Sequence, residues 1–319
     1  MNILIHIGYP KTASSWLQET LFKDENYGFY ALHDGDSKTV RDVKRMALPF
    51  YETMPFDFDA EAVRTYIDRN CPLEEERCAV ISNERLSGGA FFGGYDSVDI
   101  AKRLYSVFPN ARIFMMIREQ FDIIISQYFQ KLKKGLGQSF QRYVGKKVHD
   151  GRPSFMIDHY KYDRLIELYQ QLFGKDKVLI YPFEALKSDP FRLVNTLTRF
   201  CDLSLDFNPE LNEKYKNQYN KHSNYFAASV TRLLGPLFLS HAVNGYSPYA
   251  LPISESKGMA GLRVLRKSLG YFVPRSWDNN LLKRQHEFLS THFGPDYFAE
   301  SNRKTEVLTG LNLKDLGYQ

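Results

Sequence analysis

The chain has 319 residues, of which 43% are hydrophobic and 25% charged, and its formal net charge is +5 at pH 7. A chain of this length and composition can bury a sizeable core, which excludes a disordered, a collagen-like or a small disulfide-stapled protein. The three cysteines, Cys71, Cys78 and Cys201, have neither CxxC nor zinc-finger spacing, so we expect neither a disulfide framework nor a structural metal.

No export or membrane-spanning segment is visible in the sequence. The first residues, MNILIHIGYPK, carry no basic leader, and their apolar run is shorter than a signal-peptide core. The longest other apolar stretch, 233–243, is interrupted by Gly235 and Pro236 and falls short of the roughly 18 residues that a membrane span needs. We therefore expect a cytoplasmic protein without a membrane span.

Strand and helix patterns alternate along the first two thirds of the chain. A continuous apolar run from Ile3 to Gly8 predicts a strand, and a helix follows over 14–22. CAVIS at 78–82 and RIFMMI at 112–117 predict two further buried strands. The remaining patterns predict a strand over 177–181 and helices over 97–108, 121–133, 163–173 and 190–201.

This alternation predicts an α/β fold, a three-layer sandwich with a central parallel sheet and helices on both faces. We treat 1–319 as a single domain whose α/β cofactor-binding core spans 1–205. In the remainder, 206–319, the alternation stops, and we expect helical and loop-rich additions that cover the ligand edge of the sheet. The last two helices are expected over 279–293 and 295–304.

The loop after the first strand has the properties of a phosphate-binding site. Gly8-Tyr9-Pro10-Lys11-Thr12-Ala13-Ser14-Ser15-Trp16 joins this strand to the first helix, at the edge where parallel sheets bind ligands. The small residues Thr12, Ala13, Ser14 and Ser15 let the backbone approach phosphate oxygens, and Lys11 adds a cation. The loop is not GxxxxGK[ST], because its lysine lies three residues before the position that this pattern requires.

A second candidate anion site follows the strand over 112–117. Arg118 ends this strand, and Ser126 lies eight residues later in the following helix. An arginine there can make bidentate contacts with a phosphate, and a serine one to two turns into the helix can reach the same group. A salt bridge of Arg118 with Glu119 or Asp122 is the alternative.

Together these motifs resemble the sulfotransferases that use 3'-phosphoadenosine 5'-phosphosulfate (PAPS). HIGYPKTASSWL is similar to their 5'-phosphosulfate loop, and the Arg118 and Ser126 pair is similar to their 3'-phosphate site. The resemblance implies a P-loop-NTPase-like fold with PAPS as co-substrate. It also implies cofactor contacts from residues 11–16, Trp16 included, and from Arg118 and Ser126. It covers about the first 205 residues.

Sulfuryl transfer needs stabilisation of the leaving phosphate and a base for the acceptor proton. Lys11 is placed for the first task, and Glu84, which follows the strand over 78–82, is the candidate base. The family places a glutamate there in its carbohydrate-type members and a histidine in its cytosolic small-molecule branch, so Glu84 favours the carbohydrate-type and bacterial branch. His33 and His159 remain alternative bases. No metal is required by this scheme.

Two basic stretches bear on the acceptor. Residues 131–152 hold seven Lys or Arg against one acid, and 257–275 hold five basic residues and no acid. A polysaccharide or other anionic glycan is therefore a reasonable acceptor, through a hydroxyl or an amine, although basic loops also attract the anionic cofactor. No nucleic-acid-binding pattern is present, and the oligomeric state stays open.

Two other functions remain compatible with the sequence. A phosphotransferase such as a kinase with a divergent P-loop would require a magnesium ligand and ATP. A non-enzymatic polyanion-binding module would depend on the two basic stretches alone. Selective binding of 3'-phosphorylated nucleotides without metal would distinguish the sulfotransferase from both.

Overall fold

The computed structural model describes residues 2–23, 27–32, 45–70, 77–90, 93–145, 155–203, 224–234 and 255–319. The chain divides into two compact units. The first comprises Met1–Glu119, Met156–Asn220 and Phe298–Gln319, and the second comprises Gln120–Phe155 and Lys221–Tyr297. Each is described by itself below.

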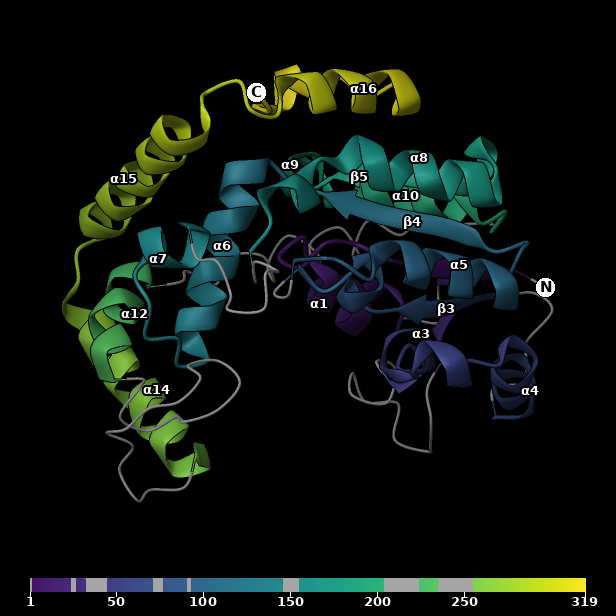
Figure 1. Cartoon of the computed structure of the whole chain (residues 1–319), viewed down its shortest axis with the longest axis horizontal. Coiled ribbons are helices and arrows are strands. Elements are labelled where there is room, and N and C mark those ends of the chain that lie inside the picture. The colour runs from purple at the N-terminus through teal and green to yellow at the C-terminus, as the bar shows by residue number, and fades with distance from the viewer. Residues whose placement is uncertain are drawn as a thin grey trace. The chain divides into compact units, whose positions relative to one another are not determined.

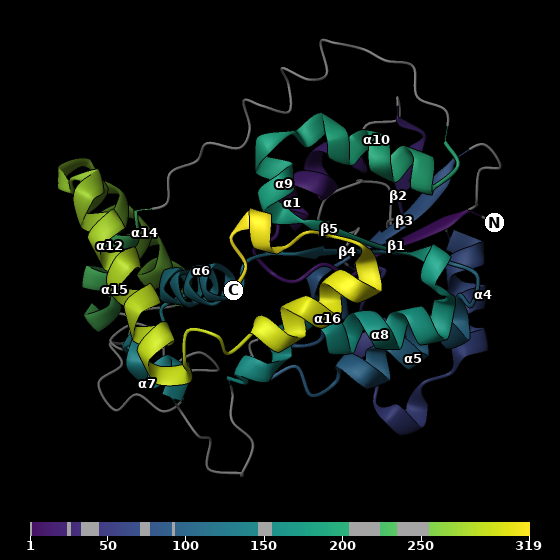
Figure 2. The same cartoon turned by 90° about the horizontal axis from the view of Figure 1, so that it is seen from above.

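The first unit is built on a five-stranded parallel sheet, as the sequence predicts (Figure 2). The strand order is β2-β3-β1-β4-β5. The strands are β1 (Ile3–His6), β2 (Phe29–Ala31), β3 (Cys78–Ser82), β4 (Arg112–Ile117) and β5 (Val178–Pro182). Every residue of β1 and β3 is buried, as expected for strands with helices over both faces. The three-residue edge strand β2 was not predicted.

Helices cover both faces of this sheet (Figure 2). On one side lie α1 (Ser14–Trp16), α9 (Phe183–Ser188) and α10 (Pro190–Phe200). On the other side lie α4 (Ala60–Asn70), α5 (Ser97–Val107), α8 (Tyr162–Phe173) and, packed on α8, α16 (Ala299–Thr309). The short turns of the unit are η1 (Leu17–Leu21), α3 (Pro49–Glu52), η3 (Pro55–Asp57), η4 (Glu84–Ser87), η6 (Ile157–Tyr160), η7 (Lys175–Lys177) and η9 (Lys314–Leu316).

Local sequence signals explain where α10 begins and which side it buries. Pro190 occupies the first turn, and the carboxylate of Asp189 accepts a hydrogen bond from the Arg192 N–H at 3.1 Å. Leu193, Val194 and Leu197 recur at helical spacing and are fully buried. They join Phe114 and Met116 of β4 in the main hydrophobic cluster, which fixes this helix against the sheet.

The second unit is helical in its described residues. Its elements are α6 (Gln120–Lys133), α7 (Phe140–Gly145), α12 (Tyr225–Thr231), η8 (Arg232–Leu234), α14 (Glu255–Phe272) and α15 (Arg275–Phe293). Asn224 caps α12 by accepting a hydrogen bond from the Ala227 N–H at 2.9 Å, and α12 packs against α6, α14 and α15. None of the helices in the described residues is both long and apolar enough to cross a membrane.

The C-terminal third differs in detail from the expected arrangement. The helix expected over 279–293 begins earlier, at Arg275, because Pro274 is extended and starts a new helix immediately after α14. The last helix spans 299–309 rather than 295–304, and with the chain end it belongs to the sheet unit. Residues 204–223 and 235–254 lie outside the described residues, so the covering of the ligand edge by 206–319 stays a prediction.

Candidate functional site

Three strand ends meet at one edge of the sheet and bring the predicted loops together. The Ile7 N–H donates to the Phe114 carbonyl at 2.9 Å, and the Tyr9 N–H donates to the Met116 carbonyl at 3.3 Å. On the other side of β1, the Asn83 N–H donates to the His6 carbonyl at 3.2 Å. The segments that carry Lys11, Glu84 and Arg118 therefore leave neighbouring strands at the same edge.

The loop after β1 has a strained backbone. Lys11 and Ala13 have φ angles of 72° and 70°, in the left-handed region that non-glycine residues rarely adopt. Each such residue costs on the order of 1–3 kcal/mol, and such strain gathers at ligand sites. Backbone N–H groups in loops that mix left-handed and right-handed residues converge on bound anions. The backbone is thus shaped as an anion cradle even though neither residue is a glycine.

Gly8 is required by crowding beneath this loop. A Cβ at residue 8 would lie 2.7 Å from Nε2 of His6 and 3.3 Å from the Thr12 hydroxyl. The His6 ring is fully buried, and its Nδ1 lies 2.8 Å from the Ser82 hydroxyl. Gln18 donates to the same hydroxyl at 3.0 Å. This buried polar network ties β1, β3 and η1 together under the loop, so His6 is a core residue.

The predicted loop contacts differ in how they are placed. Thr12 is buried, and its hydroxyl donates to the Tyr9 carbonyl within the loop. Ser14 is only 6% exposed, and its hydroxyl oxygen has no hydrogen-bond partner within the described part of the chain. Ser15 is exposed, whereas Trp16 is buried in the main hydrophobic cluster. Ser14 is therefore the hydroxyl best placed to bind a ligand at the cradle.

Arg118 lies against the loop, as its position at the end of β4 predicts. Its Nη1 donates to the Lys11 carbonyl at 3.4 Å, and its guanidinium carbon lies 4.8 Å from the centre of the Phe183 ring. The Arg118 carbonyl accepts a hydrogen bond from the Tyr162 hydroxyl at 2.6 Å. The guanidinium is thus held on the side of the sheet edge where the anion cradle lies.

A contact from the chain end also supports this strand end. Glu184, at the start of α9, accepts the Glu119 N–H on Oε1 at 3.1 Å and the Tyr318 hydroxyl on Oε2 at 2.9 Å. Tyr318 is 4% exposed, and burial together with the Glu184 carboxylate raises its pKa. Sequence reasoning missed Tyr162, Glu184 and Tyr318 as parts of the site.

The charges around Lys11 act in opposite directions on its pKa. Desolvation by the surrounding protein lowers the pKa of Lys11 below its ordinary value, and the charge of Arg118 lowers it further. The carboxylate of Glu84 raises it. All three predicted charged residues therefore lie within electrostatic range of one another in the first unit.

Glu84 opens the turn η4 directly after β3. Asn83 shapes this turn because its side-chain oxygen accepts the Arg85 N–H at 2.9 Å, and its amide donates to the Tyr51 hydroxyl at 3.2 Å. Arg85 forms an ion pair with Asp96 and lies 5.0 Å from the centre of the Tyr51 ring. These contacts hold the backbone of the turn and leave Glu84 partly exposed at the ligand edge.

The alternative base His159 lies beside the same loop. Its carbonyl accepts the Tyr9 hydroxyl at 3.1 Å, and its ring centre is 5.1 Å from that of Tyr9. Burial lowers the pKa of His159 to about 4, with Asp96 raising it and Arg85 lowering it. The imidazole is therefore neutral at pH 7, and burial makes it a weaker base than an ordinary histidine. His33 lies outside the described residues.

Ser126 is buried on α6 in the second unit, whereas Arg118 belongs to the first. Their shared contact with one phosphate stays a prediction. The basic stretch 131–152 also begins on α6, where burial and the charge of Lys134 lower the pKa of Lys131 to about 8. The other end of that stretch, 146–152, lies outside the described residues.

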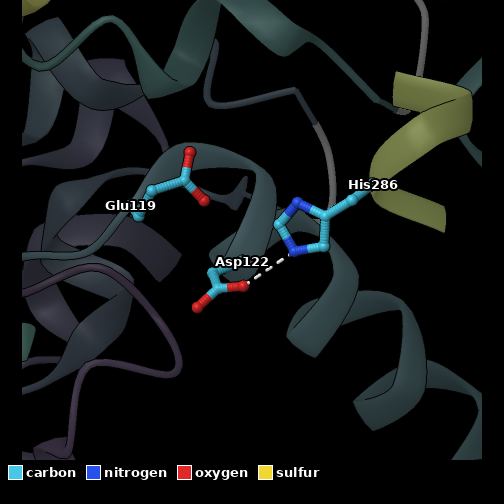
Figure 3. A group of neighbouring side chains, drawn as sticks. All are labelled: Glu119, Asp122 and His286. Carbon is cyan, nitrogen blue, oxygen red and sulfur yellow. Dashed lines mark hydrogen bonds and ion pairs between the residues drawn. The ribbon is translucent and has the colours of Figure 1, made fainter. Parts of the chain in front are cut away.

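Asp122 and His286 form a pair in the second unit that sequence reasoning did not find. Nε2 of His286 lies 2.9 Å from a carboxylate oxygen of Asp122 (Figure 3). Glu119, the third residue drawn, offers a further carboxylate that could serve a metal ion, but it belongs to the first unit. A two-residue pair on α6 and α15 falls short of the three or four ligands of protein metal sites.

The two cysteines in the described part of the chain are core residues. Cys78 and Cys201 are free thiols, both fully buried in the main hydrophobic cluster. A hydrogen bond with the Cys201 thiol and burial raise the pKa of Cys78, so it is a protonated core residue at neutral pH. Cys71 lies outside the described residues.

Comparison with known proteins confirms the resemblance found in the sequence. Residues 96–207 match the model of the sulfotransferase family. This segment runs from the start of α5 to just beyond α10 and includes Arg118 and Ser126, whereas Lys11 and Glu84 lie before it. A search of curated protein sequences gives no match.

Solved structures of sulfotransferases are similar to the chain at low scores. A sulfotransferase from Alicyclobacillus acidocaldarius shares 21% identity at a TM-score of 0.46, over 73% of this chain and 93% of that one. The sulfotransferase domain of the Synechococcus PCC 7002 olefin synthase shares 15% sequence identity at a TM-score of 0.41, over 85% of this chain and 95% of that domain. The sulfotransferase domain from the curacin biosynthetic pathway shares 14% sequence identity at a TM-score of 0.41, over 82% of this chain and 95% of that domain.

Proposed function

We propose that this chain, with its sulfotransferase-family segment, transfers a sulfuryl group from PAPS to a hydroxyl or amine of a carbohydrate acceptor. The observation that carries the proposal is the meeting of two separate anion-binding elements at one sheet edge. The strained Lys11 loop and Arg118 are in contact through the Arg118 guanidinium and the Lys11 carbonyl, 3.4 Å apart. A nucleotide with phosphates on both its 5' and 3' sides matches two such elements.

The two elements divide the donor between them in this proposal. The loop N–H groups, the Ser14 hydroxyl and Lys11 bind the 5'-phosphosulfate, because they form the cradle and its cation. Arg118 binds the 3'-phosphate, and Ser126 adds its hydroxyl. A guanidinium suits this role, since its planar set of donors matches two phosphate oxygens at once. A nucleotide with a 3'-phosphate therefore binds more tightly than an adenosine phosphate without this group.

The chemistry follows from the charges at the edge. The acceptor oxygen or nitrogen forms a bond to sulfur while the bond from sulfur to the phosphate oxygen breaks, and the electron pair leaves with adenosine 3',5'-bisphosphate (PAP). Lys11 stabilises the charge that grows on the leaving oxygen, which is the usual largest source of catalysis in group transfer. Glu84 accepts the proton of the acceptor hydroxyl. No redox step is involved.

A glycan acceptor is favoured by residues around the base. Glu84 is partly exposed, and the guanidinium carbon of the adjacent Arg85 lies 5.0 Å from the centre of the Tyr51 ring. Aromatic and guanidinium groups of this kind contact sugar rings and anionic substituents. The basic residues at the end of α6, Lys131 and Lys133, would draw an anionic glycan toward the protein.

Calorimetry with PAPS, PAP and ATP in the presence and absence of EDTA tests the proposal. We expect PAPS and PAP to bind without a metal, and ATP to bind at least tenfold more weakly because it lacks the 3'-phosphate. Magnesium-dependent ATP binding with no preference for PAP would instead indicate a phosphotransferase. Binding of sulfated polysaccharide alone, with no nucleotide binding, would indicate a polyanion-binding module.

A further inference from the structure

The outward face of α14 and the first turn of α15 combines exposed aromatic side chains with a run of cations. We call it the α14–α15 face. Its apolar members include Tyr271, Phe272 and Trp277, whose exposed fractions are 77%, 85% and 50%. Its cations are Lys257, Arg263, Lys267 and Arg275, all exposed. From residue 256 to residue 277 the sequence contains no acidic residue.

Helical geometry separates this face from the side that packs inward. Leu262 is 4% exposed, so its side chain lies on the packed side of α14, and α14 packs against α12 (Figure 1). Arg266 points inward too, since its Nη1 donates to the Leu132 carbonyl of α6 at 3.4 Å. Val264 and Tyr271, seven residues apart, lie on the opposite side and are 66% and 77% exposed. Large apolar side chains on the outside thus accompany the cations.

The aromatic groups gather where α14 ends and α15 begins. Phe272 ends α14, and Trp277 lies in the first turn of α15, where its backbone N–H donates to the Pro274 carbonyl at 3.0 Å. The Trp277 ring packs edge to face on Phe226 of α12, with ring centres 4.9 Å apart. One side of the indole is therefore anchored and half of the residue remains exposed. Contiguous exposed apolar groups of this kind mark interaction surfaces.

We propose that the α14–α15 face binds the surface of an anionic lipid bilayer. Four exposed cations with no acid between residues 256 and 277 complement a uniformly negative surface, which an anionic bilayer offers. Asp278, the next residue, is 2% exposed and accepts the Phe226 N–H, so it does not face outward. Tyrosine, phenylalanine and tryptophan at the tip favour the headgroup boundary, where an apolar ring and a polar edge are both satisfied. An acidic protein partner would match the cations, but its charged surface would not bury the three exposed aromatic residues between the two helices.

This association is peripheral and independent of the proposed transfer reaction. Each Lys or Arg close to an anionic surface strengthens partitioning by a factor of about five, and an inserted aromatic ring adds about tenfold. Because the charge contribution is screened by salt, we expect binding to weaken as ionic strength rises.

Vesicle sedimentation of the full-length chain tests the proposal. We expect it to sediment with vesicles that contain a quarter phosphatidylglycerol and not with vesicles of phosphatidylcholine alone. R263Q/K267Q should weaken partitioning about 25-fold, and Y271S/F272S, which removes two rings, about 100-fold. The matched control, K304Q/K314Q, removes two cations from the first unit and should bind like the unchanged protein.

Tryptophan emission gives an independent reading, because the chain has only two tryptophans. Trp16 is buried and Trp277 is half exposed, so a blue shift on adding anionic vesicles should arise from Trp277 and vanish in W277F. Equal binding to both vesicle types, or unchanged binding of both double variants, would overturn the proposal. Salt-sensitive binding to polyglutamate without vesicle binding would overturn it in favour of an acidic protein partner.

Discussion

Replacement of Arg118 by glutamine should remove the preference of the protein for a 3'-phosphate. In the structure the guanidinium is held between the Lys11 carbonyl, at 3.4 Å, and the Phe183 ring, at 4.8 Å. A charge-assisted hydrogen bond to a phosphate contributes about 1.5–3 kcal/mol. R118Q should therefore weaken PAP binding by about tenfold to 100-fold, and leave the binding of adenosine 5'-phosphate, which lacks the 3' group, nearly unchanged.

A matched control comes from the other end of the same strand. Arg112, the first residue of β4, donates to the Asn2 side chain at 2.8 Å and forms an ion pair with Asp202, away from the ligand edge. R112Q should alter stability without altering the preference for PAP. Titration calorimetry with both nucleotides, alongside thermal unfolding, measures these effects. An equal loss of affinity for PAP and adenosine 5'-phosphate in R118Q would show that Arg118 does not recognise the 3'-phosphate.

Three further predictions concern the base, the lysine and the chain end. E84Q should lower kcat at least 100-fold and leave the affinity for PAP unchanged, whereas H159N should retain turnover. Loss of turnover in H159N and not in E84Q, measured in steady-state assays, would identify His159 as the base. Because the pKa of Lys11 is lowered, Lys11 loses its proton at a lower pH than an ordinary lysine does, so kcat should fall early on the alkaline side. E84Q should move this alkaline decrease in kcat to still lower pH, since the Glu84 carboxylate raises the pKa of Lys11. The pH profile is measured on the residual activity of E84Q, and an unchanged profile would contradict the electrostatic coupling of the two residues. Y318F should weaken PAP binding about threefold to tenfold, because Glu184 loses one hydrogen bond of about 1 kcal/mol and positions Glu119 less firmly; a loss of thermal stability with unchanged PAP affinity would restrict Tyr318 to a structural role.

Much of the sheet could be predicted from the sequence because its strands are short, continuous apolar runs. CAVIS and RIFMMI have the predicted bounds in the structure, and the alternation with helices gave the parallel arrangement. The edge strand β2 escaped prediction because three residues carry too little pattern. It forms through pairing with β3, which is a tertiary contact.

The site was predictable only in the parts that local motifs carry. Lys11 and Arg118 were placed by the turn and the strand end that precede them, and the structure brings both together. The left-handed φ angles of Lys11 and Ala13 were not foreseeable, because neither is a glycine. Tyr318 reaches Glu184 across 134 residues of sequence, and no local pattern encodes such a contact.

The most direct test of the account is transfer itself, followed with PAPS labelled on its sulfur. Incubation with a panel of glycans, hydroxylated and aminated, should yield one labelled product and an equal amount of PAP in the absence of added metal. K11A should abolish this product while it still binds PAP. Release of label only as free sulfate, or no label transfer to any acceptor while ATP supports phosphorylation, would contradict the account.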